Sequence, residues 1–226
     1  MDENLMEPAN MTNTQRCVDL LGKNDFDGVR HLLEADPACA QARDANGVSL
    51  LMHSLYRGRR DLAELIASQK KTLDIFETTS LGRLDHLREM ARDSATINSR
   101  SADGFTALHF ACFFGQPESA RLLLENGAAV DAVAANPMAV MPLHSAASAR
   151  NLEAARLLLD HGAPVNARQQ GGWVPIHAAA QNGDRAMVEL LLKHHADPKL
   201  ANDEGKTPAM VAREKGHQEI AVRLEQ

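Results

Sequence analysis

The stretch DGFTALHFACFFG at 103–115 decides the fold, because similar phrases return later in the chain at a nearly fixed interval. They read AVMPLHSAASAR at 139–150, GWVPIHAAAQNG at 172–183 and GKTPAMVAREKG at 205–216. Each copy is followed by a second apolar pattern typical of a helix, such as SARLLLENGA or EAARLLLDHGA. A period of 33 to 35 residues predicts a stack of units, each made of one helix pair.

The residues that open each phrase are those that start helices. Thr106 and Thr207 are good N-cap residues, because a threonine hydroxyl accepts a hydrogen bond from a free amide of the first turn. Pro142, Pro175 and Pro208 stand where the first helical position tolerates proline. The phrase therefore predicts the first helix of each pair.

The phrases resemble ankyrin repeats, whose pattern is roughly G-x-T-P-L-H-x-A-A-x-x-G followed by a helix ending L-L-L-x-x-G-A. The match is close at 106–115, 142–147 and 175–183, and weaker at 207–216. The resemblance covers about residues 12–226 and implies an all-α solenoid with short β-hairpin loops. The irregular start followed by regular copies is also similar to a group of bacterial ankyrin-repeat proteins, which brings no established activity with it.

Aligning the ends of the first helices extends the pattern to seven helix pairs. The aligned residues are Asn24, Gly58, Gly82, Gly115, Arg150, Gly183 and Gly216, in steps of 34, 24, 33, 35, 33 and 33. The step of 24 indicates a missing hairpin after Ala67, and the step of 35 a lengthened loop around 136–138. We expect a flexible acidic tail at 1–11 and one domain at 12–226, with units near 14–36, 47–68, 72–92, 104–127, 139–162, 172–195 and 205–226.

Arg150 stands where the other regular copies have glycine. If this position is left-handed, an arginine there carries a strain of roughly 1 kcal/mol that glycine avoids. Met141 replaces the usual threonine in the same unit, so a capping hydrogen bond is also expected to be missing.

Composition narrows the functional classes. The chain is 44% hydrophobic and 24% charged, with a formal net charge of −6, which argues against a general nucleic-acid binder. Its apolar runs are too short to span a membrane, and its first residues, MDENLMEPANMTNT, lack the apolar region of a secretory signal. An odd count of three cysteines fits a reducing compartment, so a cytoplasmic protein is expected.

Three histidines recur at one position of the phrase, namely His109, His144 and His177. Stacked units hold such residues about 10 Å apart, too far for one zinc ion with bonds near 2.1 Å. The resemblance implies that they are structural, bonding to backbone and to the neighbouring threonine. His194 and His195 lie at a helix end, where a polar or cationic side chain suits the helix dipole, so no metal site is predicted.

Signs of catalysis or cofactor binding are lacking. The chain has no G-x-S-x-G elbow, no G-x-G-x-x-G and no Walker-type loop, and its S-x-x-K match at 68–71 stands alone in a linker. Cys112 occupies a position that is usually alanine in ankyrin repeats, which predicts burial rather than reactivity. We therefore expect no enzyme activity and no cofactor.

The best functional candidates are aromatic residues at two repeated positions outside the expected core. One position lies just before the T-P-L-H phrase, where Val48, Phe105, Val140, Trp173 and Lys206 stand in order. The other consists of the two residues just before the residue that ends the first helix, such as Phe113 and Phe114 before Gly115. Large aromatics on a solvent-facing stripe indicate an interface, while the alternative is that some of them pack between adjacent loops. The predicted partner-binding residues are Tyr56, Arg57, Phe105, Phe113, Phe114 and Trp173.

These features predict a monomeric protein–protein interaction module or adaptor, which binds its partner through the concave face and hairpin tips of an ankyrin stack. An alternative is a regulatory subunit of an enzyme whose catalytic part is on another chain. A third hypothesis is a self-assembling structural unit, against which the polar and irregular end repeat argues. Neither nucleic acid nor membrane is expected as a partner.

Overall fold

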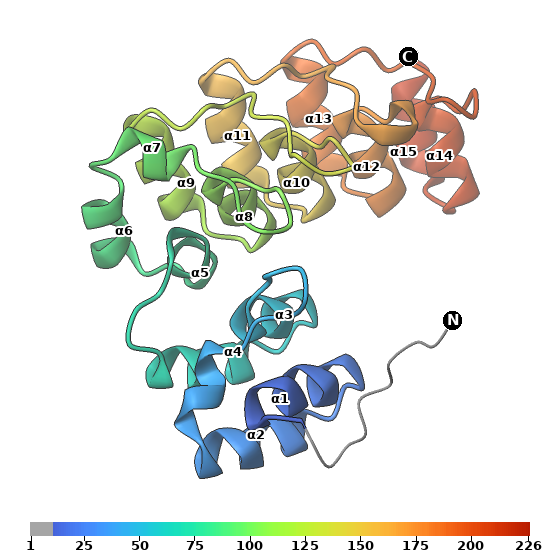
Figure 1. The fold of residues 1–226 in the computed structure, drawn as a ribbon. Coiled ribbons are helices and arrows are strands. Elements are labelled where there is room, and N and C mark those ends of the chain that lie inside the picture. The colour runs from blue at the N-terminus through green and yellow to red at the C-terminus, as the bar shows by residue number, and fades with distance from the viewer. Residues whose placement is uncertain (1–10) are drawn as a thin grey trace, which may run out of the picture. The chain divides into compact units, whose positions relative to one another are not determined.

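The computed structural model describes residues 11–226, which form a series of paired helices (Figure 1). The acidic tail predicted for residues 1–11 lies outside the described residues except for Met11. The chain divides into two compact units, one reaching to Glu77 and the other spanning Thr78–Gln226, with the division inside helix α5 (Ile75–Leu81). The single domain expected at 12–226 stays a prediction.

The first unit contains two complete helix pairs. Its elements are α1 (Asn13–Gly22), α2 (Phe26–Ala35), the 3-10 helix η2 (Pro37–Gln41), α3 (Leu50–Tyr56) and α4 (Arg60–Gln69). Helices α1, α2 and α3 start at N-cap side chains, those of Thr12, Asp25 and Ser49. Their amphipathic faces supply a continuous core that includes Cys17, Val29, Leu33, Cys39, Leu51, Leu62 and Ile66, all fully buried.

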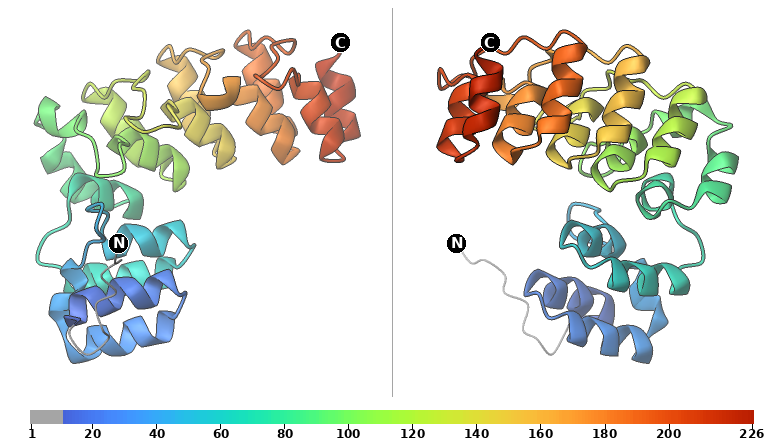
Figure 2. Two further views of the ribbon diagram at one scale, coloured as in Figure 1. Left: turned by 45° about the vertical axis from the view of Figure 1, so that its right-hand side comes forward. Right: turned by 180° about the vertical axis from the view of Figure 1, so that it is seen from behind.

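The second unit contains five pairs, the first of which begins in the first unit. Its helices are α6 (Leu84–Met90), α7 (Ser94–Ile97), α8 (Ala107–Phe113), α9 (Pro117–Glu125), α10 (Pro142–Ser148), α11 (Leu152–Asp160), α12 (Pro175–Asn182), α13 (Arg185–Lys193), α14 (Pro208–Glu214) and α15 (Gln218–Leu224). The first helices α8, α10, α12 and α14 pack side by side, and α9, α11 and α13 form a second row with α15 at its end (Figure 2). Close packing is possible because Ala111, Ala146 and Ala179 face their neighbours and are fully buried.

All seven turns between paired helices are left-handed, as the sequence alignment predicts. Five of them use glycine, with φ between 68° and 82°. The other two are Asn24 at 60° and Arg150 at 58°, where a side chain must tolerate the same backbone. The predicted count of seven helix pairs is therefore confirmed.

The loops that lead from one pair to the next, called fingers below, are closed by backbone hydrogen bonds. Three of them in the second unit join residues four apart, as from Ser101 N–H to Phe105 C=O at 2.8 Å. The finger before α10 instead joins Ala134 N–H to Val140 C=O, six apart, which is the predicted two-residue lengthening. Among residues 11–226 no strand forms, and the single β-bridge pairs Arg43 with Ser49.

Neighbouring fingers are also bonded to one another. Ala135 donates its N–H to Gly104 C=O, Gln170 to Met138 C=O, and Asp203 to Gly171 C=O. The first contact needs glycine, because a Cβ on Gly104 would lie 2.6 Å from the oxygen of Ala135. These bonds fix the fingers of the second unit as one continuous edge.

The predicted loss of a finger after α4 is confirmed, since only residues 70–74 separate α4 from α5. A buried ion pair marks this tight connection. Lys70 Nζ lies 2.6 Å from Glu77 Oε1, and their side chains are 3% and 0% exposed. Asp74 caps the start of α5 by accepting a hydrogen bond from Glu77 N–H. Such a pair is costly to break on one side only, so it fixes the route of the chain where the finger is missing.

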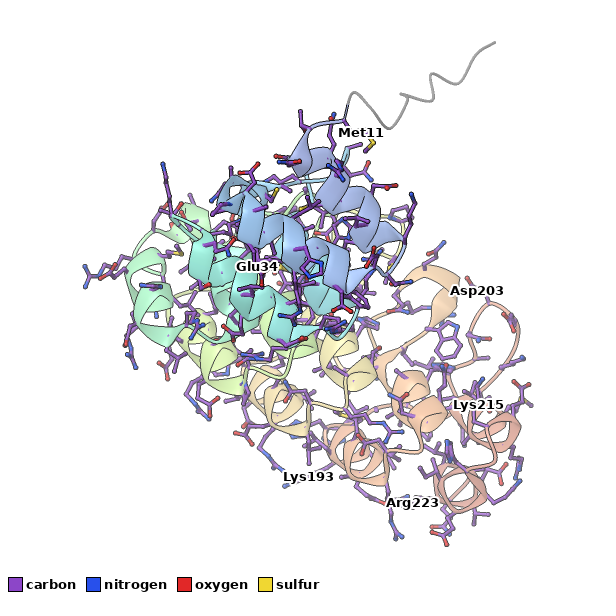
Figure 3. All side chains as sticks on the ribbon, turned by 90° about the horizontal axis from the view of Figure 1, so that it is seen from below. Met11, Glu34, Lys193, Asp203, Lys215 and Arg223 are labelled. Carbon is purple, nitrogen blue, oxygen red and sulfur yellow. The ribbon has the colours of Figure 1, made fainter. Side chains whose placement is uncertain are left out.

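Charged side chains lie on the finger loops and on the row of second helices. Figure 3 labels Asp203 on a finger, and Lys193 and Arg223 on α13 and α15. Arg223 pairs with Glu189 at 2.8 Å and so ties α15 to α13. No helix in the described part of the chain combines the length and the apolar character that crossing a bilayer requires.

Candidate functional site

The finger face of the second unit is built from two equivalent positions in each repeat. We define it as the residue just before each first helix's N-cap together with the residue eight places later on that helix. In chain order the paired residues are Phe105 and Phe113, Val140 and Ser148, Trp173 and Gln181, and Lys206 and Glu214. The face thus changes along the stack, from aromatic through small and amide-bearing to charged.

Four phenylalanines form one cluster at the first of these repeats. The Phe105 ring meets the Phe110 ring edge-on at 5.6 Å between centroids, and Phe110 stacks on Phe114 at 6.1 Å. Phe113 contacts Phe114 edge-on at 5.2 Å. Phe110 is buried, Phe105 and Phe114 are half-buried, and Phe113 is 47% exposed. The buried rings hold Phe113 as a rigid apolar projection, which lowers the entropy lost on binding.

Trp173 lies two repeats further along the same face and is half-buried. Its ring contacts His177 at 5.3 Å, and the left-handed Gly171 passes close to the edge of the indole. A groove of about 390 Å³ opens beside it, lined by Ser148, Gln169, Gln170, Trp173, Ala178, Gln181 and Asn182. The structure therefore places Trp173 at a surface groove rather than in the Phe cluster.

One expectation about the middle repeat needs correction. Val140 belongs to the position treated as lying outside the core, yet it is only 5% exposed. Met138, in the lengthened part of the finger, is 49% exposed instead. The lengthened segment lies between Ala134 and Val140, and Met138 is exposed within it, while Val133 just before it is 42% exposed. In the sequence, only the two-residue lengthening of the loop around 136–138 pointed to Met138.

Tyr56 and Arg57 lie in the first unit, at the end of α3. Tyr56 is 38% exposed and its ring contacts His53 edge-on at 6.5 Å. The Arg57 guanidinium donates to the carbonyl of His53 at 3.3 Å and is exposed. Both residues belong to the first unit, and their role in binding stays a prediction.

Arg59 and Arg60, which follow Arg57, are engaged in ion pairs. Arg59 and Arg30 both bind Asp61, and Arg60 lies 3.5 Å from Glu64. The guanidinium beside Asp61 also holds the pKa of that carboxyl far below its usual range. These ion pairs neutralise the charges of Arg59 and Arg60. They therefore argue against a basic patch that attracts an acidic partner.

The three repeated histidines are structural. The Nδ1 atom of His109 accepts hydrogen bonds from Thr106 N–H at 3.2 Å and from its hydroxyl at 2.8 Å. Nε2 must then carry the proton, and it donates to Val140 C=O in the next finger at 3.0 Å. His144 and His177 bond in the same way to Ala167 and Lys206. Burial lowers the pKa of His109 to about 4 and lowers the pKa values of the other two.

The described residues contain no group of three or more His, Cys, Asp or Glu side chains placed to hold a metal ion. His195 is left-handed at φ 66° and ends the turn after α13, while Asp197 donates its N–H to Asn166 Oδ1 at 2.9 Å. The buried thiols of Cys17, Cys39 and Cys112 are free. Cys112 is fully buried, which confirms the prediction. Burial raises the pKa of Cys17 to about 12 and also raises the pKa of Cys112, so both thiols stay protonated.

Comparison with known proteins supports the repeat assignment. A family model described as ankyrin repeats (3 copies) matches residues 79–169 and again 143–224, so that the two matches together span nearly all of the second unit. A search of curated proteins found no match. Repeats of this family generally mediate protein–protein interactions and are typically non-catalytic.

Proposed function

Since the chain belongs to the ankyrin repeat family, we propose that it is an interaction module whose protein partner binds the finger face of the second unit. The observation that carries this proposal is the exposed Phe113, supported by three further rings and followed along the stack by Met138 in the next finger and by Trp173 on the finger face. Large apolar side chains held rigidly on a surface are the usual centres of protein interfaces. Tyr56 and Arg57 are proposed as secondary contacts.

We also propose that the protein acts as a cytoplasmic monomer, with neither nucleic acid nor membrane as its partner. The free thiols support a reducing compartment, and the net charge of −6 disfavours nucleic acid. The alternative role, as a regulatory subunit of an enzyme, uses the same surface and differs only in the identity of the partner.

The test begins with capture of partners by the tagged full chain in its native host, followed by affinity measurement with one purified partner. Phe113→Ser and Trp173→Ala should each weaken binding by about 2 kcal/mol if these residues are hot spots. Because Phe113 projects from the surface, its replacement should change the free energy of unfolding by only about 0.5 kcal/mol.

The matched control is Val222→Ser, which removes a side chain of 52% exposure from α15, away from the finger face. We expect it to leave both affinity and stability unchanged. Unchanged affinity in both finger-face variants, with normal melting, would place the interface elsewhere and refute the proposal.

A further inference from the structure

The groove beside Trp173 has a small residue, Ser148, in its lining. Phe113, Ser148 and Gln181 occupy the same position in three successive repeats. Ser148 and Gln181 line the groove whereas Phe113 does not, and the short serine leaves room in front of the middle repeat. The resulting groove has a volume of about 390 Å³.

Every polar side chain that lines the groove is uncharged. Asn182 Nδ2 donates to the carbonyls of Ala147 and Ser148, at 3.2 and 3.1 Å, and so spans the two helices α10 and α12. The remaining polar side chains make no hydrogen bond within residues 11–226, and they are those of Ser148, Gln169, Gln170 and Gln181. Three primary amides with unused donors and acceptors therefore converge on one groove. Each amide presents the same N–H and C=O pair that a peptide bond needs.

The nearest acidic groups along the face are already paired with Lys206. Lys206 lies 3.0 Å from Glu214 and 3.2 Å from Glu204 in the next repeat. Arg150 donates from its guanidinium to Asn182 C=O. A basic side chain entering the groove would lose hydration and meet no acidic group in the lining.

We propose that the groove binds an extended, uncharged segment of the partner protein, with one aliphatic side chain over Ser148 against the Trp173 ring. The glutamine amides hydrogen-bond the backbone of that segment, and the indole supplies apolar contact area. This inference rests on the proposed function, since it names the part of the partner that the finger face recognises.

The test uses random short peptides displayed on phage and selected against the full chain. Selected peptides should share one aliphatic residue flanked by uncharged residues. Trp173 is the only tryptophan, so its emission reports directly on the groove. Synthetic versions of the selected peptides should shift that emission to shorter wavelength and shield it from acrylamide.

Two variants test the assignment to this groove. Ser148→Tyr fills it from an exposed position, and Gln181→Glu introduces an unpaired charge with little change of shape. Each should weaken peptide binding by about tenfold or more. Gln218→Glu, the same change at an exposed site on α15, is the matched control and should have no effect.

Selection of charged peptides, equal binding by Ser148→Tyr, or no selected peptide that changes the Trp173 emission would each overturn the inference. These results differ from failure of the proposed function. A folded partner that loses affinity with Phe113→Ser but not with Ser148→Tyr would keep the interface and remove the peptide groove.

Discussion

The repeats with a histidine at the fourth position of the phrase differ instructively from the α3–α4 repeat, where Met52 takes that place. His109, His144 and His177 each donate to a carbonyl in the finger of the following repeat. The α3–α4 repeat is followed by the connection 70–74, which has no finger. A histidine there would lack its acceptor, whereas the apolar Met52 is buried at 5% exposure without one. The histidine therefore joins a repeat to its neighbour and is not needed within a single helix pair.

Acid should break the histidine-joined repeats first, and this is the largest effect we expect. Burial lowers the folded-state pKa of His109 from 6.5 to about 4, so the unfolded chain binds more protons between these values. Its contribution to stability is present above pH 6.5 and is lost as the pH falls toward 4, which amounts to about 3 kcal/mol. His144 and His177 act in the same direction.

Urea unfolding at several pH values from 7 to 4 measures this loss. In His109→Met the slope between pH 6.5 and 4 should be smaller, while the exposed His86→Gln should keep the parent slope. A parent protein with constant stability over that range would contradict the assignment of neutral, buried imidazoles.

Replacing one histidine at neutral pH should have the next largest effect. His109→Met leaves Thr106 N–H buried without a partner and removes the bond to Val140 C=O, which still accepts from Ala134 N–H, so it should cost about 2–3 kcal/mol in the free energy of unfolding. The matched change Met52→Leu alters shape without removing a hydrogen bond, and should cost less than about 1.5 kcal/mol. Equal losses would show that the two positions differ in packing alone and that the bond between repeats contributes nothing.

The repeat architecture was readable from the sequence because it depends on local rules. Periodic glycines predicted the left-handed turns, and the same alignment placed Asn24 and Arg150 among them. The steps of 24 and 35 located the missing and the lengthened fingers, because a change in chain length between fixed helices can only be absorbed in the connection.

The candidate surface was less predictable because it depends on contacts between repeats. The exchange of Val140 for Met138 follows from the path of the lengthened finger, which no periodic pattern describes. The pairing of Arg30 with Asp61 joins two different helix pairs, a relation that the local sequence does not show. The groove beside Trp173 requires that Ser148 and Gln169 come together from different elements, a relation that only the packed structure displays.

Substitutions of Arg150 test how a left-handed turn tolerates a side chain, and they have the smallest expected effect on the free energy of unfolding. Its left-handed backbone carries roughly 1 kcal/mol of strain that glycine would remove, but its guanidinium donates to Asn182 C=O in the next repeat. Arg150→Gly relieves the strain and loses the hydrogen bond, so we expect a change within about 0.5 kcal/mol. Arg150→Ala keeps the strain and also loses the bond, and should be less stable than the glycine variant by about 1 kcal/mol.

The difference in the free energy of unfolding between Arg150→Gly and Arg150→Ala reports the backbone strain, because both variants lack the guanidinium. Gly115 provides the control, since a Cβ there would meet no heavy atom within 4 Å and the cost of Gly115→Ala reports strain alone. Chemical denaturation of the three variants should therefore give one common strain value near 1 kcal/mol. If Arg150→Ala matches Arg150→Gly while Gly115→Ala is destabilised, the turn after α10 relaxes in a way that the regular turns cannot. In that case the lengthened finger and the small residues around Ser148 make this repeat the most adaptable of the stack.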